Sequence, residues 1–527
     1  MTLVQVIDTL VPTFILEKGF KAPSLPLVLV TMVISSVFSV IIKRREYISQ
    51  YFRIRKALQH FPGPKPHWLF GNIFQLGKPN ENRIKLIHNH VKKYDKCYTY
   101  WFGIFPVLIC SHRGAAKSII KASVPKESWI GNWMRPWLGH GLILASGKRW
   151  ARNRKLLTSV FHFHNLKSYL KVYNECANIL VNKWRQYADM PHSFDEHPDI
   201  KMLSFDIILQ CVFSVKTDCQ INKTHHPYLT AVQQLTRLVI DRVLTLHHYI
   251  DWIYLISTKG KRYYDLCDAV HSFADQIIQK RVENLRSHKD NKMTDQQKHK
   301  RIDFIDILLT ARDETGQGLK LREIRDEAHT FMFAGYDTTA SALGWTLYCL
   351  AKYGEHQTKV REEIDVIFKD KDDVEWDDLS SLTYTTMCIK EAMRLYTTVP
   401  SVERKLNRDM TIDNKFVPAG TTVRIYLHAL CNREDTWENP TEFIPQRFNT
   451  ENSKLRDPYD YMPFSAGHRN CIGKHFALNE MKVAVSKILH HYELEIDHQR
   501  LAKRYHAIVS QPENGLWIKI KNRQRIH

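Results

Sequence analysis

A short segment around one cysteine constrains the fold of this chain more than any other feature. It reads Phe464-Ser465-Ala466-Gly467-His468-Arg469-Asn470-Cys471-Ile472-Gly473, and a helical pattern from Lys474 to His491 follows it. A cysteine just ahead of a helix lies near the positive end of the helix dipole, and neighbouring amides can donate hydrogen bonds to its sulfur. Both effects favour a thiolate. A lone cysteine is more often a core thiol, so its neighbours carry the inference that Cys471 is a metal ligand.

This segment resembles the heme-binding signature of the cytochrome P450 heme-thiolate monooxygenases, F-x-x-G-x-R-x-C-x-G, at each fixed position. The resemblance implies a heme b whose iron is bound by the Cys471 thiolate, a ligand that favours O–O cleavage. The segment departs from the most similar branch at His468, where that branch usually has proline. Around the heme, the resemblance places Phe464, Gly467, Arg469 and Gly473.

A second motif lies in the middle of a long helical pattern without proline, residues 321–353. It reads Ala334-Gly335-Tyr336-Asp337-Thr338-Thr339 and resembles the oxygen-activation motif of the same family. Splitting O₂ requires protons, so the resemblance implies that Asp337 and Thr338 are catalytic, with the acid behind the alcohol. Taken alone, these polar residues would more often form a face packed against another helix.

Two small residues of this motif are expected to shape the space above the heme. Gly335 should leave room for the oxygen. Ala334 stands where some related proteins have a glutamate that links covalently to the heme. No covalent heme ester is therefore expected.

The heme propionates need cations, and guanidinium groups suit carboxylates. The resemblance places Trp150 and Arg154, one helical turn apart, on the propionates together with Arg404 and Arg469. Each of these arginines taken alone is more often a solvated surface charge.

A third group of residues is expected to be structural. Glu391-Ala392-Met393-Arg394 matches the family's E-x-x-R helix, and Arg447 resembles its third member. The spacing places Glu391 and Arg394 on one helix face, where two guanidiniums can pair with one buried carboxylate. We expect this group to hold the scaffold and assign it no catalytic role.

An apolar run near the N-terminus, residues 25–42, contains no charge and ends at Lys43-Arg44-Arg45. It is long enough to cross a bilayer core of about 30 Å. Because basic residues stay on the cytosolic side, the run predicts a single-pass anchor with the rest of the chain facing the cytosol. A cleaved signal peptide is the alternative, but no basic region precedes the run and no small-residue cleavage site follows it. The resemblance implies the endoplasmic reticulum membrane.

The remaining patterns predict a mainly α body with small β-sheets, which is the cytochrome P450 fold preceded by one transmembrane helix. Strand patterns occur at 98–111 and 413–426, helical periodicity dominates 146–286, and Glu513-Asn514-Gly515 is typical of a hairpin turn. The expected organisation is a luminal or interfacial segment (1–24), the anchor (25–42), a basic and proline-rich hinge (43–66) and the heme-binding monooxygenase domain (67–527).

The net charge and the cysteines limit the kinds of partner and of covalent bond that are expected. The formal charge of +21 would suit nucleic acid, an anionic membrane or an acidic protein. No nucleic-acid motif is present, so the excess is better explained by the lipid surface and by docking of a protein partner. The ten cysteines have no C-x-x-C spacing. In a reducing cytosol, all except Cys471 are expected to be ordinary thiols.

The resemblance covers residues 61–520 and is closest to the fatty-acid and eicosanoid omega-hydroxylase branch. It implies hydroxylation of a lipophilic substrate with O₂ and with electrons from NADPH-cytochrome P450 reductase, and cytochrome b5 is a candidate second donor. The alternatives are a steroid or xenobiotic hydroxylase of the same fold, a heme-thiolate isomerase, and a non-enzymatic heme sensor. A proton relay would be superfluous in the last two. Stretches that carry this resemblance are Trp137-Leu138-Gly139-His140-Gly141-Leu142, Phe161-His162-Phe163 and Trp376-Asp377-Asp378-Leu379.

Overall fold

The computed structural model describes residues 25–221, 226–290, 304–312, 316–369 and 371–523. The chain forms two units, which divide between Ala57 and Leu58. The segment 1–24, expected to be luminal or interfacial, lies outside the described residues. The second unit contains every residue expected to bind heme or substrate.

Helix α2, Leu25–Leu58, contains the run expected to cross the membrane. It continues through the basic cluster, so helix is absent from only the last part of the expected hinge, residues 59–66. The side chains of much of the apolar run lie outside the described residues. Among the residues that the structure does describe, no helix combines the length and the apolarity needed to cross a membrane.

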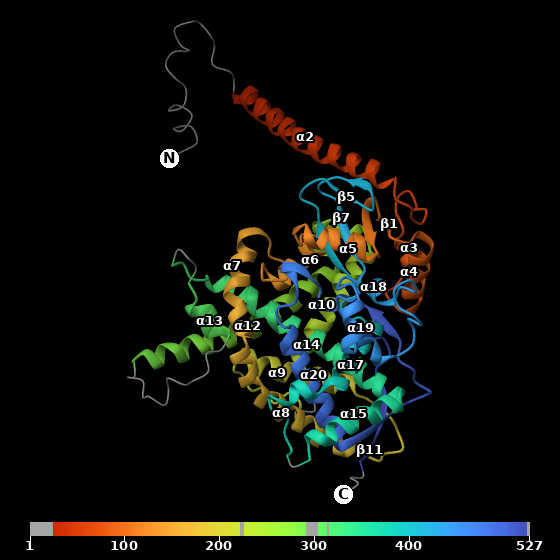
Figure 1. Ribbon diagram of the computed structural model, residues 1–527. Coiled ribbons are helices and arrows are strands. Elements are labelled where there is room, and N and C mark those ends of the chain that lie inside the picture. Colours follow the sequence, from red (N-terminus) through yellow and green to blue (C-terminus); the bar gives the residue numbers. More distant parts are fainter. Residues whose placement is uncertain (1–24, 222–225, 291–303, 313–315, 370, 524–527) are drawn as a thin grey trace, which may run out of the picture. The chain divides into compact units, whose positions relative to one another are not determined.

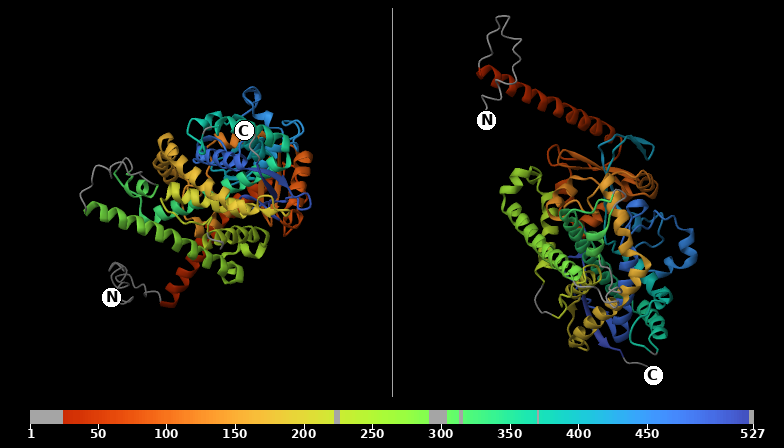
Figure 2. Two further views of the ribbon diagram at one scale, coloured as in Figure 1. Left: turned by 90° about the horizontal axis from the view of Figure 1, so that it is seen from below. Right: turned by 90° about the vertical axis from the view of Figure 1, so that its left-hand side faces the viewer.

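The second unit is mainly helical, as the sequence predicts (Figure 1). Its central element is α14, which contacts α9, α12, α17 and α20 and is labelled within the body in Figure 1. Figure 2 shows this helical body from two further sides. Helix α14 spans 321–352, so the predicted long helix is confirmed. The helices are α3 (Ile73–Leu76), α4 (Glu81–Tyr94), α5 (Arg113–Lys121), α6 (Trp129–Leu138), α7 (Gly147–Thr158), α8 (Phe163–Trp184), α9 (His197–Val212), α10 (Pro227–Leu244), α11 (Asp251–Ile256), α12 (Thr258–Asp290), α13 (Phe304–Thr310), α14 (Leu321–Lys352), α15 (Gly354–Ile367), α16 (Asp378–Ser381), α17 (Thr383–Leu395), α18 (Leu427–Asn432), α19 (Thr450–Leu455) and α20 (Lys474–His491).

The β-sheets are small. One sheet has the order β1-β2-β7-β4, with β2 and β7 parallel and the other pairs antiparallel. The others pair β10 with β9, β5 with β6, and β11 with both β3 and β8. The strands are β1 (Cys97–Phe102), β2 (Phe105–Cys110), β3 (Phe194–Asp195), β4 (Val402–Lys405), β5 (Met410–Ile412), β6 (Lys415–Val417), β7 (Thr422–Ile425), β8 (Tyr492–Ile496), β9 (Arg504–His506), β10 (Ser510–Pro512) and β11 (Trp517–Asn522).

The predicted hairpin around residues 513–515 is wrong. The chain does turn there, with Gly515 at a φ of 86°. However, β10 before the turn pairs with β9, whereas β11 after it pairs with β8 and β3. The turn therefore transfers the chain between two sheets, a difference that local turn chemistry cannot encode because it depends on distant strands.

The expected group around Glu391 is confirmed as structural. Arg394 donates hydrogen bonds from Nε and Nη2 to the two carboxylate oxygens of Glu391, at 2.7 and 2.8 Å. Arg447 Nε donates to Glu391 Oε1 at 3.3 Å. Neither Glu391 nor Arg394 has any exposed side-chain area, so full pairing offsets the burial of these charges.

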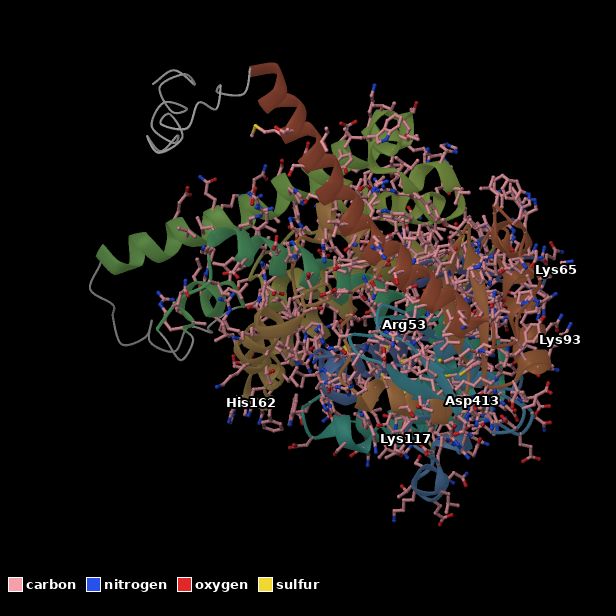
Figure 3. The ribbon with its side chains drawn as sticks, turned by 90° about the horizontal axis from the view of Figure 1, so that it is seen from above. Arg53, Lys65, Lys93, Lys117, His162 and Asp413 are labelled. Atoms are coloured by element: carbon pink, nitrogen blue, oxygen red, sulfur yellow. The ribbon has the colours of Figure 1, made fainter. Side chains whose placement is uncertain are left out.

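The surface of the second unit is rich in cations. Figure 3 shows Lys65 and Lys93 at the rim of the body, and both side chains are exposed. The cysteines follow the predicted pattern: all ten lie within the described residues, none forms a disulfide, and all except Cys471 are buried.

Candidate functional site

A cavity of about 260 Å³ connects the two motifs that the sequence singles out. The middle of α14 forms one wall, and the loop between the short 3₁₀ turn η7 (Gly467–Arg469) and α20 forms another. The Cys471 side chain is exposed to this cavity, although the surrounding protein encloses it. The structure brings together the predicted site residues Trp150, Arg154, Ala334, Thr338, Phe464, Arg469, Cys471 and Gly473 in its wall.

The cysteine loop is held by its own backbone. The Cys471 amide donates to the Phe464 carbonyl at 2.9 Å. Gly467 has a φ of 69°, and a Cβ there would lie 2.9 Å from Ile120 Cγ2, so the loop requires glycine at this position. Gly473 differs, since a Cβ there would make only an ordinary contact with Phe161, at 3.8 Å. Gly473 lines the cavity, so its lack of a side chain lets a flat ligand approach the backbone.

The protein alone does not favour the Cys471 thiolate. Burial raises the pKa of the Cys471 thiol above its ordinary value, although the Gly473 amide and the cations Arg154 and Lys126 act in the opposite direction. The Gly473 amide thus acts in the expected direction, but burial outweighs it in the polypeptide by itself. A metal cation bound by Cys471 would supply the missing stabilisation, because a metal displaces the thiol proton.

Several cations converge on the cavity without a carboxylate among them. Arg154 Nη1 and Nη2 donate to the main-chain and side-chain oxygens of Asn470, at 2.9 and 2.8 Å. Arg469 lies 4.0 Å from the centre of the Trp150 ring, and its Nη1 donates to the Ala145 carbonyl at 2.8 Å. Burial lowers the pKa of Arg469 to about 10, and two neighbouring arginines act in the same direction.

Lys126 is a cavity residue that the sequence did not reveal. Burial, together with the nearby Arg404 and Arg469, lowers the pKa of Lys126 to about 7. Arg404 lies behind the wall and not in it, with Nη1 donating to the Glu403 carbonyl at 2.8 Å. No motif surrounds Lys126, so nothing in the sequence distinguishes it from other lysines.

These observations test whether the residues fit a heme. The cations Arg154, Arg469 and Lys126 face one cavity, and the buried Nε of Arg469 has no hydrogen-bond partner among the described residues. A ligand with two carboxylates would compensate this charge, and Cys471 provides a soft donor in the same space. The residues therefore fit a flat, dianionic metal complex such as heme.

The acid and alcohol of α14 point to different places. Thr338 lines the cavity and donates to the Ala334 carbonyl one turn earlier, at 2.7 Å. Asp337 is absent from the cavity wall and instead accepts from Gln511 Nε2 at 3.1 Å, with Lys201 Nζ at 3.9 Å. Burial raises the pKa of Asp337, while Lys201 and Gln511 oppose the rise. Asp337 thus lies behind Thr338, where it can hold a proton.

Gly335 has a packing contact that the sequence did not reveal. A Cβ on Gly335 would lie 2.5 Å from Ile208 Cδ1, on the neighbouring helix α9. The glycine therefore allows α9 and α14 to pack closely. Gly335 also lines the cavity around Cys471, where its lack of a side chain leaves room as expected.

Comparison with known proteins agrees with this geometry. The family model described as "Cytochrome P450" matches residues 61–518. The chain is 35% identical to cytochrome P450 4B1 of Rattus norvegicus, with 95% of this chain and 98% of the relative covered. It is 38% identical to the ultra-long-chain fatty acid omega-hydroxylase of Homo sapiens, with 88% and 89% covered, and 37% identical to cytochrome P450 4F12 of Homo sapiens, with 88% and 90% covered.

Proposed function

Because the chain belongs to the cytochrome P450 family, we propose that it is a membrane-bound monooxygenase that hydroxylates fatty acids or eicosanoids at or near the terminal carbon. Family membership itself makes the protein a heme-thiolate monooxygenase of the oxidoreductase class. The observation that carries the proposal is the single cavity walled by Cys471 and Thr338. A relative with 38% identity is named a fatty acid omega-hydroxylase, which supports the substrate class.

In this proposal Cys471 binds the iron of heme b. Arg154 and Arg469, with Trp150, hold the propionates, and Lys126 joins them because it faces the same cavity. Arg404 adds positive charge from behind the wall. When bound, the heme iron activates O₂, and its thiolate ligand favours O–O cleavage. Ala334 has no carboxyl group, so the heme carries no ester to this position.

Thr338 and Asp337 supply protons in the proposed reaction. The Thr338 hydroxyl lines the cavity, and its hydrogen bond to the Ala334 carbonyl holds the oxygen in place. Asp337 is held by Gln511 and has a raised pKa because it is buried, so it retains a proton more readily than an exposed aspartate. In this proposal Asp337 is the proton reserve of the polar interior, and Thr338 presents its hydroxyl at the cavity.

The membrane and partner assignments belong to the same proposal. Residues 25–42 form a single-pass anchor in the endoplasmic reticulum membrane, and the catalytic domain faces the cytosol. This orientation follows from the basic cluster after the run. NADPH-cytochrome P450 reductase donates the electrons, with cytochrome b5 as a second donor, and the excess of exposed cations such as Lys65 and Lys93 favours acidic partners.

A reconstituted assay tests the function. The full chain is incubated with the reductase, NADPH and a panel of fatty acids and steroids, and the products are identified by mass spectrometry. We expect fatty acids hydroxylated at or next to the terminal carbon. Steroid products alone would refute the substrate class, and products formed without NADPH would refute the monooxygenase reaction.

The Cys471→Ala variant is the matched control for the heme assignment. We expect it to lose turnover and the absorption that the reduced, CO-bound thiolate heme gives in the wild type. An active variant would contradict the assignment of Cys471 as the iron ligand.

A further inference from the structure

A second cavity, of about 320 Å³, extends from Thr338 on α14 to Arg83 on α4. The two cavities share six lining residues: Lys126, Ile143, Ala334, Thr338, Val399 and Val402. One end of this space therefore adjoins the heme site. Its length is lined mainly by apolar side chains, among them Ile87, Met134, Ile143, Leu144, Val243 and Val399.

Arg83 gives the far end of this cavity a positive charge. Its Nε donates to the Leu76 carbonyl at 2.9 Å, and Nη2 donates to the Gly77 carbonyl. A guanidinium has five N–H donors, so these two bonds leave others available. No carboxylate of the described residues forms an ion pair with Arg83, and burial lowers its pKa to about 10. A half-buried cation without a counter-charge is costly unless a ligand supplies one.

His506 provides a second polar group at the same end. It lines the cavity and is 8% exposed, and neither ring nitrogen has a hydrogen-bond partner among the described residues. Burial lowers the pKa of His506 well below its ordinary value, and Arg504 and Arg83 contribute to this shift. The imidazole is therefore neutral, and one of its nitrogens can donate to an anion.

The other polar residues of the wall do not cancel this charge. Tyr100 and Tyr426 line the cavity close enough to Arg83 to interact with it electrostatically. Glu403 also lines it, but Arg424 Nε donates to Glu403 Oε1 at 2.9 Å, so this carboxylate already has its own cation. The far end thus presents one uncompensated guanidinium, a neutral imidazole and phenols.

We infer that this end binds the carboxylate of a long-chain acid, with Arg83 as the anchor, and that the hydrocarbon chain extends along the apolar wall toward Thr338. The inference rests on the proposed function and deepens it. An anchor at a fixed distance from Thr338 selects the oxidised carbon by its distance from the carboxylate. Lys126 is the competing cation, but it lies at the opposite end, next to Cys471. A carboxylate bound there would direct oxidation to carbons near the carboxyl group.

The test compares two ligands that differ only at the head group. Dissociation constants of dodecanoate and 1-dodecanol are measured by titration calorimetry on the heme-loaded wild type and on Arg83→Met, without NADPH. Loss of a hydrogen-bonded charge pair should weaken dodecanoate about tenfold or more. The affinity for 1-dodecanol should not change. Equal losses for both ligands, or none for the acid, would overturn the anchor.

Two further variants keep the test decisive. Lys85→Met removes the same charge from an exposed position of α4 that does not line the cavity, and it should leave both affinities unchanged. Tyr426→Phe leaves the contacts of Arg83 with Leu76 and Gly77 intact and should weaken dodecanoate selectively. If Arg83→Met does not fold, an unchanged dodecanoate affinity in Tyr426→Phe would count against the site.

Product analysis separates this inference from the proposed function. With reductase and NADPH, wild type should oxidise dodecanoate at one or two carbons near the methyl end, and Arg83→Met should give a wider spread. Oxidation near the carboxyl group would favour Lys126 and overturn the anchor. Arg83-dependent binding without hydroxylation would refute the substrate proposal and leave the anchor supported.

Discussion

Gly335→Ala tests whether this glycine exists for helix packing. The new Cβ would lie 2.5 Å from Ile208 Cδ1 and 2.6 Å from Cγ1, which are closer than any ordinary van der Waals contact. The Ile208 side chain must move, and overpacking of this kind typically costs about 1–3 kcal/mol. Alanine is also about 1 kcal/mol better than glycine inside a helix. The net loss in the free energy of unfolding should therefore be about 0–2 kcal/mol.

The same substitution should change sign when Ile208 is truncated. Ile208→Ala removes Cγ1 and Cδ1, and the nearest remaining Ile208 atom, Cβ, lies 3.4 Å from the new methyl position, an ordinary contact. Ile208→Ala alone should cost about 2–5 kcal/mol, because it leaves a cavity. In that background only the helix-propensity gain remains, so Gly335→Ala should stabilise the protein by up to about 1 kcal/mol.

Equilibrium urea unfolding of the four proteins, followed by circular dichroism, gives the coupling energy directly. A favourable coupling of about 1–3 kcal/mol between the two substitutions is expected for side chains in contact. Additive effects would refute the packing role of Gly335. In that case the glycine would have to be explained by the cavity that it also lines.

Three further predictions follow from the same contacts. Glu391→Gln leaves Arg394 buried without a counter-charge and should lower the free energy of unfolding by about 3–5 kcal/mol. The control Glu493→Gln removes a more exposed ion pair with Arg361 and should cost less than about 1 kcal/mol. Equal shifts of the melting temperature in the two variants would contradict this prediction. Burial raises the pKa of Glu480 to about 8, so the folded state binds a proton that the unfolded chain has released. The contribution of this group is therefore lost as pH rises from about 4.5 toward 8, and Glu480→Gln should flatten the stability profile in that window. Thr338→Ala should retain heme but divert NADPH to peroxide, with Thr338→Ser as the control, and unchanged coupling would exclude the hydroxyl from proton delivery.

Local sequence patterns predict those parts of the molecule whose residues lie close together in the chain. The long helix, the cysteine loop and the Glu391–Arg394 pair each lie within one continuous stretch. Periodicity predicts the helix, and the resemblance to cytochrome P450 motifs predicts the other two. The strands at 98–111 and 413–426 were found for the same reason. The partners of β10 and β11 were not, because β9, β8 and β3 lie elsewhere in the sequence.

The directions of the side chains at the site could not be predicted from the sequence. Asp337 and Thr338 are adjacent, and the motif predicts that they act together. In the structure a helix turn of about 100° per residue places Thr338 in the cavity and Asp337 against Gln511 and Lys201. Gln511 belongs to β10, far along the chain, and no sequence pattern links it to α14.

The proposed carboxylate anchor shows why the substrate preference could not be predicted from the sequence. Its polar groups come from α4, β1, β9 and the residue after β7, and none belongs to a motif. Arg83 alone reads as one of many cations in a chain of net charge +21, and His506 as one of 27 histidines. They are distinguished by their place at one end of the cavity, where Arg83 lacks a carboxylate partner and both ring nitrogens of His506 lack a hydrogen bond among the described residues. Substrate choice in such a protein therefore depends on unpaired groups that only the assembled fold reveals, whereas the heme chemistry is encoded in contiguous motifs.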